Sequence, residues 1–440
     1  MFAYFNQKDA GSNLFNLLVA SFPISFIAGN MIININIILL ILSTLIIHGK
    51  SYLNTRYYFL DKIIFLFFSF IIFTAIANDY FFFQEKLQWK GYFSTIIKSI
   101  LFLKYLLLYL SLRILIEKNI LKLKLFFISC ALSTLFVCFD LFYQGIYGQD
   151  IFGFEKPELG RKLGGPFDDE LIAGGYIQRF SLFSFFLIPL FYKEKFSNFI
   201  KFIIPIFFVI FLSGIIISGN RMPLLLFVFT IFLVIIFQKQ TRKYFFSFLI
   251  LFSIFFSLIF TLNNTVKDNF YSFHHQIKNS FTAIKSQDFK NNNMPSYLKE
   301  FATFYDTWLL NKYIGGGIKN FRYYCHTRPN IEKNSKFICN MHPHNYYLEV
   351  LTETGLIGFV ILINIFILIL YLSFVKKYFS KSVLNNDIMI IPFVFLFITE
   401  IFPLKSTGSF FTTGNSTYLF LIIGIMIGLI RRKNFIENNN

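Results

Sequence analysis

The chain has 440 residues, 55% of them hydrophobic, and a mean hydropathy of +0.60. A water-soluble protein of this length could not bury so much apolar surface, so the composition excludes that class. A net charge of +18 is compatible with a nucleic-acid partner. In a membrane protein, however, the first explanation is the excess of Lys and Arg in cytoplasmic loops, and we expect no nucleic-acid partner.

Apolar runs of about 17–25 residues recur along the chain and are long enough to cross a bilayer as helices. The predicted fold class is therefore an all-α polytopic membrane protein. The first run lacks a basic leading region and a small-residue cleavage site, so we expect a retained helix and not a signal peptide. About twelve spans are predicted, at residues 13–29, 31–47, 60–77, 93–116, 124–145, 171–191, 199–218, 221–237, 244–262, 346–375, 387–402 and 416–430.

Charge in the short connections predicts the orientation. Alternate connections are basic and nearly free of acidic residues, so we place them in the cytoplasm together with both termini. The other side then holds the loops 78–92, 146–170, 263–345 and 403–415 and the turn near Gly219. The basic set contains Lys50, Arg56, Lys62, Lys118, Lys122, Lys124, Lys193, Lys195, Lys239, Arg242, Lys243, Lys376, Lys377, Lys381, Arg431, Arg432 and Lys433.

Three regions follow from this pattern. Residues 1–262 form a nine-helix N-terminal membrane region, 263–345 a large outer loop with short helices, and 346–440 a three-helix C-terminal membrane region. Cys325 and Cys339 both lie in the outer loop, where an oxidising compartment favours a disulfide between them; two free cysteines are the alternative. Cys130 and Cys138 lie within a span and are predicted to be packing residues.

Arg179 is a charge inside a predicted span, and such a charge is a functional hypothesis by default. It lies eight residues past Leu171, or about 12 Å into the sixth span at 1.5 Å per residue. The alternatives are that its side chain reaches back to the outer interface, or that it pairs with a neighbouring carboxylate.

Arg221 opens the eighth span in "SGNRMPLL" and faces outward. Pro223 fits the first turn of a helix, where its missing N–H costs nothing. A helix N-terminus offers unpaired N–H groups, and the planar guanidinium binds phosphate oxygens in pairs. We interpret Arg221 as a phosphate ligand, with a plain interfacial anchor as the alternative.

Arg161 begins the outer segment "RKLGGPFDDELIAGGY". Two glycine pairs and a proline predict a tight loop that can approach a ligand closely. Asp168, Asp169 and Glu170 then precede a helix, where acidic residues also suit the positive end of the helix dipole without any further role.

Histidine is scarce, with six in the chain, yet two flank a proline in "MHPHNYYLEVLTETGLIGFV". Asn345 can cap the helix that begins at the next residue, which leaves His342 and His344 unexplained. A metal site with His326, His274 or His275 matches no standard ligand spacing. A neutral imidazole that accepts a proton from a hydroxyl nucleophile is the interpretation we prefer.

These motifs together resemble the bacterial O-antigen ligase and O-antigen polymerase superfamily. His344 and Asn345, then nine residues, then the stretch from Gly355 to Gly358 are similar to its histidine motif, and "SGNRMPLL" to its outward arginine motif. "RKLGGPFDDELIAGGYIQRF" and "YDTWLLNKYIGGGIKNFRYYC" also look like family segments. The resemblance covers roughly residues 160–225 and 300–360.

The resemblance implies a metal-independent, inverting glycosyltransferase without cofactors, at the periplasmic face of the bacterial inner membrane. The donor would be a glycan on undecaprenyl pyrophosphate. The acceptor would be lipid A core in a ligase, which we favour, or a second lipid-linked glycan in a polymerase. His344 would activate the acceptor hydroxyl, and Arg221 with Arg179 or Arg161 would hold the leaving pyrophosphate. Membrane lipids are the remaining expected partners.

Two departures from the family pattern concern the histidine motif. Phe359 and Val360 follow Gly358, where some ligases have a pair of Thr residues, and His342 is an additional histidine that leaves the base open between it and His344. A transporter of an anionic lipid or solute is the more remote alternative. It should show charges through the membrane depth and often related halves, whereas these charges gather near the outer face.

Overall fold

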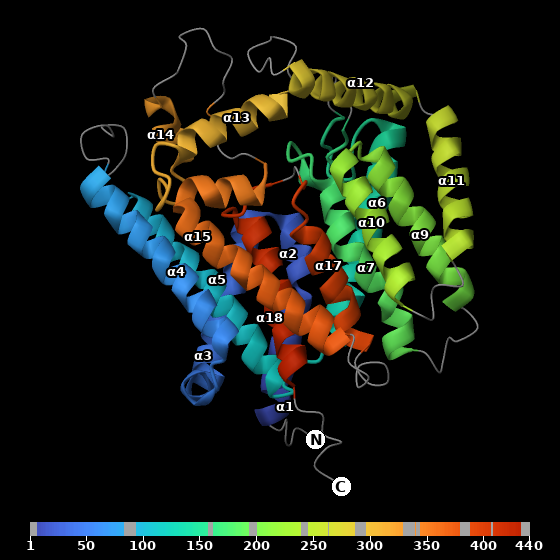
Figure 1. Cartoon of the computed structure of the whole chain (residues 1–440). Helices are drawn as coiled ribbons and strands as arrows, with labels where there is room; N and C mark the ends of the chain where they lie inside the picture. Colours follow the sequence, from blue (N-terminus) through green and yellow to red (C-terminus); the bar gives the residue numbers. More distant parts are fainter. Residues whose placement is uncertain are drawn as a thin grey trace.

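The computed structural model describes residues 7–82, 94–156, 162–192, 200–238, 245–262, 264–286, 296–328, 339, 344–378, 388–405 and 408–432. Within these ranges the chain forms a bundle of helices, which α12 and α13 cross at one end (Figure 1). The one β-type pairing among the described residues is a bridge between Gln149 and Glu155.

Helices occupy every apolar run that the sequence predicts to be a span. They are α1 (Gln7–Ala20), α2 (Phe22–Ala28), α3 (Asn30–Asn54), α4 (Phe59–Ala77), α5 (Ser94–Glu117), α6 (Lys124–Tyr147), α7 (Ala173–Phe191), α9 (Ile200–Ile217), α10 (Arg221–Phe237), α11 (Phe245–Leu262), α15 (Tyr346–Leu370), α17 (Ile391–Glu400) and α18 (Thr413–Arg431). The segment between α11 and α15 contains α12 (Asn264–Ser286), α13 (Ser296–Trp308) and α14 (Phe321–Tyr324).

Six helical segments in the described part of the chain are long and apolar enough to cross a membrane: residues 30–54, 59–80, 94–117, 124–147, 346–376 and 413–431. α1 and α2 together would form a seventh span, bent by 43°. The chain is thus a multi-pass membrane protein. Twelve spans, two cytoplasmic termini and the three-region division stay predictions.

The core of the bundle is apolar and rich in phenylalanine. Phe68 of α4, Phe102 of α5 and Phe420 of α18 pack ring against ring and join three helices from opposite ends of the sequence. Cys130 and Cys138 are buried in α6, as expected for packing residues.

A buried cluster of charges lies where α4 begins and α5 and α18 end. Asp61 forms salt bridges with Arg113 at 2.8 Å and with Arg431 at 2.9 Å. Arg113 also pairs with Glu117 at 2.6 Å, and the Tyr109 hydroxyl donates to Asp61. Because burying one charge without a partner is costly, this set of ion pairs ties the last helix to two early ones.

α15 is kinked at Gly355, whose φ of +65° interrupts the helix. A kink leaves backbone groups without their helical partners, and the loop at residues 312–317 supplies new ones. The N–H of Leu356 donates to the carbonyl of Lys312 at 2.8 Å, and the N–H of Gly317 donates to that of Glu353 at the same distance. The loop therefore fixes the first segment of α15, residues 346–354, at an angle to the rest.

The disulfide between Cys325 and Cys339 closes the chain beside this loop, with the two Cα atoms 5.8 Å apart. The neighbouring Tyr324 is buried, and its hydroxyl donates to the carbonyl of Thr352 at 2.6 Å. α14 is thus attached to the first segment of α15 through the side chain of Tyr324.

Candidate functional site

Asn345 organises the turn that contains His344. Its side-chain oxygen accepts from the N–H groups of Tyr347 at 3.0 Å and Leu348 at 3.2 Å, which caps α15. Its amide donates to the carbonyls of Pro403 at 2.8 Å and Lys405 at 3.3 Å. One side chain therefore joins the start of α15 to the loop that follows α17.

His344 itself is exposed and has a φ of +54°, a left-handed conformation that is unfavourable for a non-glycine residue. Such backbone strain persists only where the surroundings hold it, and here the next residue, Asn345, is held from both sides. The exposed imidazole is consistent with contact to a substrate. His342, the other candidate base, lies outside the described residues.

Arg179 lies in a largely buried polar cluster. Its guanidinium donates to Glu400 at 2.7 Å and to Asn415 at 2.6 Å, and a longer bond of 3.4 Å reaches the Tyr346 hydroxyl. It also lies 4.8 Å from the ring centroid of Tyr418. The structure thus shows the carboxylate partner that was one of the alternatives for Arg179, supplied by the last turn of α17.

Glu400 has a second cation. The Lys405 amine lies 2.6 Å from the same carboxylate, and the Tyr346 hydroxyl donates to it as well. Lys405 is 5% exposed and Glu400 1%. Burial lowers the pKa of Lys405 to about 7, against the opposite effect of Glu400 and in line with the repulsion from Arg179.

Arg221 begins α10, as predicted, but makes other contacts. Its guanidinium donates to Gln276 at 3.1 Å and to the Ser272 hydroxyl, both on α12. The contacts of Arg179 go instead to α15, α17 and α18. The contacts described for the two arginines predicted to bind one pyrophosphate thus lie on different helices, and those of Arg221 lie on α12.

The remaining candidates differ in setting. Asp168 is exposed, with a φ of +52°, at the end of a short 3₁₀ turn, and Gly358 is buried against Thr354 in α15. Arg161 lies outside the described residues. Within the ranges that the structure describes, no group of three or more His, Cys, Asp or Glu residues could hold a metal ion.

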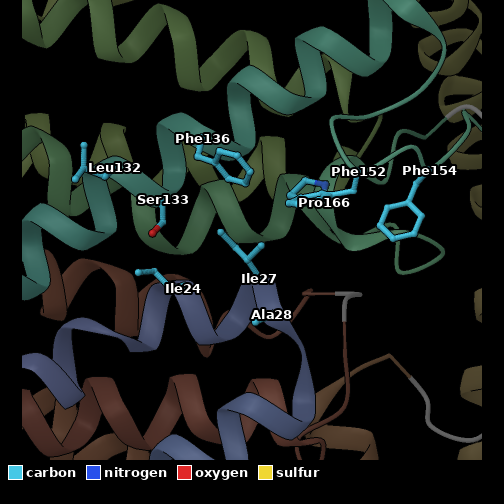
Figure 2. Close-up of a pocket in the computed structure, with 9 residues that line it drawn as sticks. All are labelled: Ile24, Ile27, Ala28, Leu132, Ser133, Phe136, Phe152, Phe154 and Pro166. Carbon is cyan, nitrogen blue, oxygen red and sulfur yellow. The ribbon is translucent and has the colours of Figure 1, made fainter.

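An apolar groove of about 590 Å³ lies between α2 and α6. Figure 2 shows side chains of α2 opposite those of α6, with Phe152, Phe154 and Pro166 of the following loop at one end. An apolar recess on a membrane protein can accept a hydrocarbon chain. The lining residues are Ile24, Ile27, Ala28, Leu132, Ser133, Phe136, Phe152, Phe154 and Pro166.

A series of aromatic contacts connects the groove with the polar cluster around Arg179. Phe167, the residue after Pro166, contacts Tyr176, with 5.4 Å between the ring centroids. Tyr176 contacts Phe180 at 4.8 Å, and Phe180 contacts Tyr418 at 5.6 Å. Tyr418 is the ring under the Arg179 guanidinium. An apolar recess and a buried cationic centre are thus linked by one layer of aromatic side chains.

The sequence motifs did not single out Glu400, Lys405 or Tyr346. For Glu400 a signal was present, because it is a carboxylate inside the predicted span 387–402, where an ionisable residue indicates a site or a partner. For Lys405 there was none, since one lysine in an outer loop has no distinctive pattern.

Fold and site together define a polytopic helical membrane protein with a cationic centre and an exposed histidine near one end of its bundle. Residues 206–363 match the family model described as O-antigen ligase. This match confirms the resemblance to the O-antigen ligase-like superfamily, a family of glycosyl-transferring membrane enzymes of the ligase or polymerase type. The matched segment contains Arg221 and His344; Arg179, Glu400 and Lys405 lie outside it. No curated protein matches the chain.

Proposed function

We propose that this protein transfers a glycan from undecaprenyl pyrophosphate to an acceptor hydroxyl at the periplasmic face of the inner membrane. Lipid A core is the acceptor that we favour, which makes the protein an O-antigen ligase. The observation that carries the proposal is the link through Asn345. That residue holds the turn of His344 and the loop of Lys405 together, so a potential base and a buried cationic centre form one structural unit.

The proposed chemistry is a single displacement. The acceptor oxygen attacks the anomeric carbon from the face opposite the pyrophosphate, and the bond from that carbon to the phosphate oxygen breaks. The configuration inverts, His344 takes the hydroxyl proton, and the electron pair leaves with undecaprenyl pyrophosphate. Pyrophosphate is a good leaving group, so the protein mainly positions the reactants and stabilises the charge that develops.

Arg179 is suited to that second task. It is held in place by Glu400 and Asn415, and a preorganised cation in a site with little water stabilises charge more than one in solvent. We propose Arg221 as a further phosphate ligand, which requires α12 to move or to share its contacts. No metal ion takes part in the proposed step, so activity should persist in a chelator.

The groove between α2 and α6 is our proposed site for part of the polyprenyl chain. Its lining is apolar, and the aromatic layer from Phe167 to Tyr418 leads from it to Arg179. A chain anchored there would limit the positions open to the pyrophosphate, which lowers the entropy lost on reaching the reactive geometry.

The test is a deletion strain in which surface polysaccharide and lipid-linked precursors are compared on gels. A ligase leaves long chains on undecaprenyl pyrophosphate and none on lipid A core. Core that carries only one repeat unit would instead identify the polymerase, with a second lipid-linked glycan as acceptor. Glycans that remain normal in both fractions would contradict the proposal and favour the transporter.

A further inference from the structure

Lys405 is a buried cation for which neither the motifs nor the proposed mechanism has a role. Its amine contacts Glu400 at 2.6 Å and the Tyr346 hydroxyl at 3.5 Å, and it lies 4.8 Å from the centroid of the Tyr346 ring. The backbone of Lys405 lies in the loop after α17 and not in a helix. Lysine is rarely buried to this extent without a specific reason.

Among the described residues, the charges that are in direct contact in this cluster do not balance. Arg179 and Lys405 both pair with the single carboxylate of Glu400. Glu349, the carboxylate in the first turn of α15, already accepts hydrogen bonds from the Ser409 hydroxyl and from the backbone N–H of Phe410. Because a buried charge is stable only when it is paired, an anion would complete the cluster.

The position of Lys405 also relates it to the candidate base. The amide of Asn345 donates to the carbonyl of Lys405, and Asn345 is the residue after His344. This hydrogen bond uses the backbone carbonyl of Lys405 and not its side chain. It therefore fixes the loop without engaging the lysine amine. A ligand that reaches His344 is therefore close to the segment that presents Lys405.

We propose that Lys405 binds a phosphate oxygen of the polyprenyl pyrophosphate donor, beside Arg179; this rests on the proposed function. An ammonium group has three donors, of which Glu400 and Tyr346 engage two, and the third is directed to the ligand. Glu400 is then the counter-ion of both cations, and keeps them in place when no donor is bound. Lysine suits this role because it binds phosphate as a point charge.

The experiment measures equilibrium binding of undecaprenyl pyrophosphate to purified full-length protein in nanodiscs. Lys405→Met should weaken binding by about tenfold to hundredfold, the loss expected for one charged hydrogen bond. Lys405→Arg keeps the charge and should stay within a few-fold of the wild type. Lys122→Met removes an exposed lysine as the matched control and should change nothing.

Two further probes identify what Lys405 recognises. Undecaprenol, which has the chain without the phosphates, should bind equally to the wild type and to Lys405→Met. Lipid A, the other source of phosphate, should also bind equally. Unchanged affinity for undecaprenyl pyrophosphate in Lys405→Met would overturn the proposal, and so would a loss confined to lipid A.

A measurement on the wild type covers the case in which Lys405→Met does not fold. Acylation of lysines, followed by mass spectrometry, should show slower modification of Lys405 when undecaprenyl pyrophosphate is bound and no change with undecaprenol. Equal modification with both would refute the role. The outcome is separate from the proposed function, because a wild type that binds donor but transfers no glycan contradicts the function and leaves Lys405 as a donor ligand.

Discussion

Gly355 offers a direct test of the kink that orients the first segment of α15. With a φ of +65°, a side chain there is strained in any surroundings. A Cβ would also lie 2.3 Å from the carbonyl carbon and oxygen of Tyr313 and 2.5 Å from the nitrogen of Ile314. Gly355→Ala therefore has to displace the docked loop.

Gly29 provides the matched control. Its φ of +97° and ψ of 175° lie in the same largely glycine-only region as the +65° and −172° of Gly355, but nothing lies within 4 Å of a Cβ built on Gly29. Both substitutions to Ala therefore share the conformational cost, which is about 1–3 kcal/mol. The excess for Gly355→Ala comes from overpacking, about 1–3 kcal/mol, and from each lost docking hydrogen bond, about 1 kcal/mol. We expect a difference of about 2–4 kcal/mol in the free energy of unfolding.

The assay is denaturant unfolding of the purified protein, read by tryptophan fluorescence. Trp308 donates its indole N–H to the carbonyl of Lys312 at 2.9 Å, so it lies at the loop that Gly355→Ala displaces. The folded Gly355→Ala variant should therefore already differ from the wild type in emission, whereas Gly29→Ala should not. Equal destabilisation by the two substitutions, with unchanged emission in both, would refute the account of the kink.

Three further predictions concern the site. His344→Ala should lower glycan transfer by about 10²–10⁴-fold with normal expression. His326→Ala, which removes an exposed histidine of the outer loop, should retain activity. Full activity of His344→Ala would exclude the role of His344 as base. Arg221→Lys should lose about tenfold or more in transfer, because lysine cannot bind phosphate in bidentate fashion, and wild-type turnover would favour an interfacial anchor. Since burial lowers the pKa of Lys405 to about 7, its amine loses its charge as the pH rises through that value. The affinity for the donor should therefore fall between about pH 6 and pH 8 in the wild type more than in Lys405→Arg. Identical pH profiles of the two proteins would contradict this.

Much of the helical framework is predictable from the sequence, because each apolar run must satisfy its backbone hydrogen bonds internally. The bend between α1 and α2 has a local signal in Pro23, at the start of α2, whereas the kink at Gly355 depends on the distant loop that packs against it. The capping role of Asn345 follows from local chemistry. Its bonds to Pro403 and Lys405 do not, because they join residues about 60 positions apart.

The site shows the same division. The motifs nominate His344 and Arg179 as residues, but the partners of Arg179 come from three helices far along the chain. The position of Glu400 within an apolar run marks it in the sequence as an unusual carboxylate. Lys405 becomes unusual only because the fold buries its amine against Glu400. Residue types can be read from the sequence, and their electrostatic surroundings depend on the packed fold.

The buried charges at the other end of the bundle have a consequence for how the protein is made. Asp61, Arg113 and Glu117 are synthesised early and contain two negative charges and one positive. The balancing charge is Arg431, which lies more than 300 residues further along the chain. Until the ribosome has reached that residue, the cluster is incomplete and retains an uncompensated carboxylate. Insertion of the first helices therefore carries an electrostatic cost that only the arrival of α18 removes.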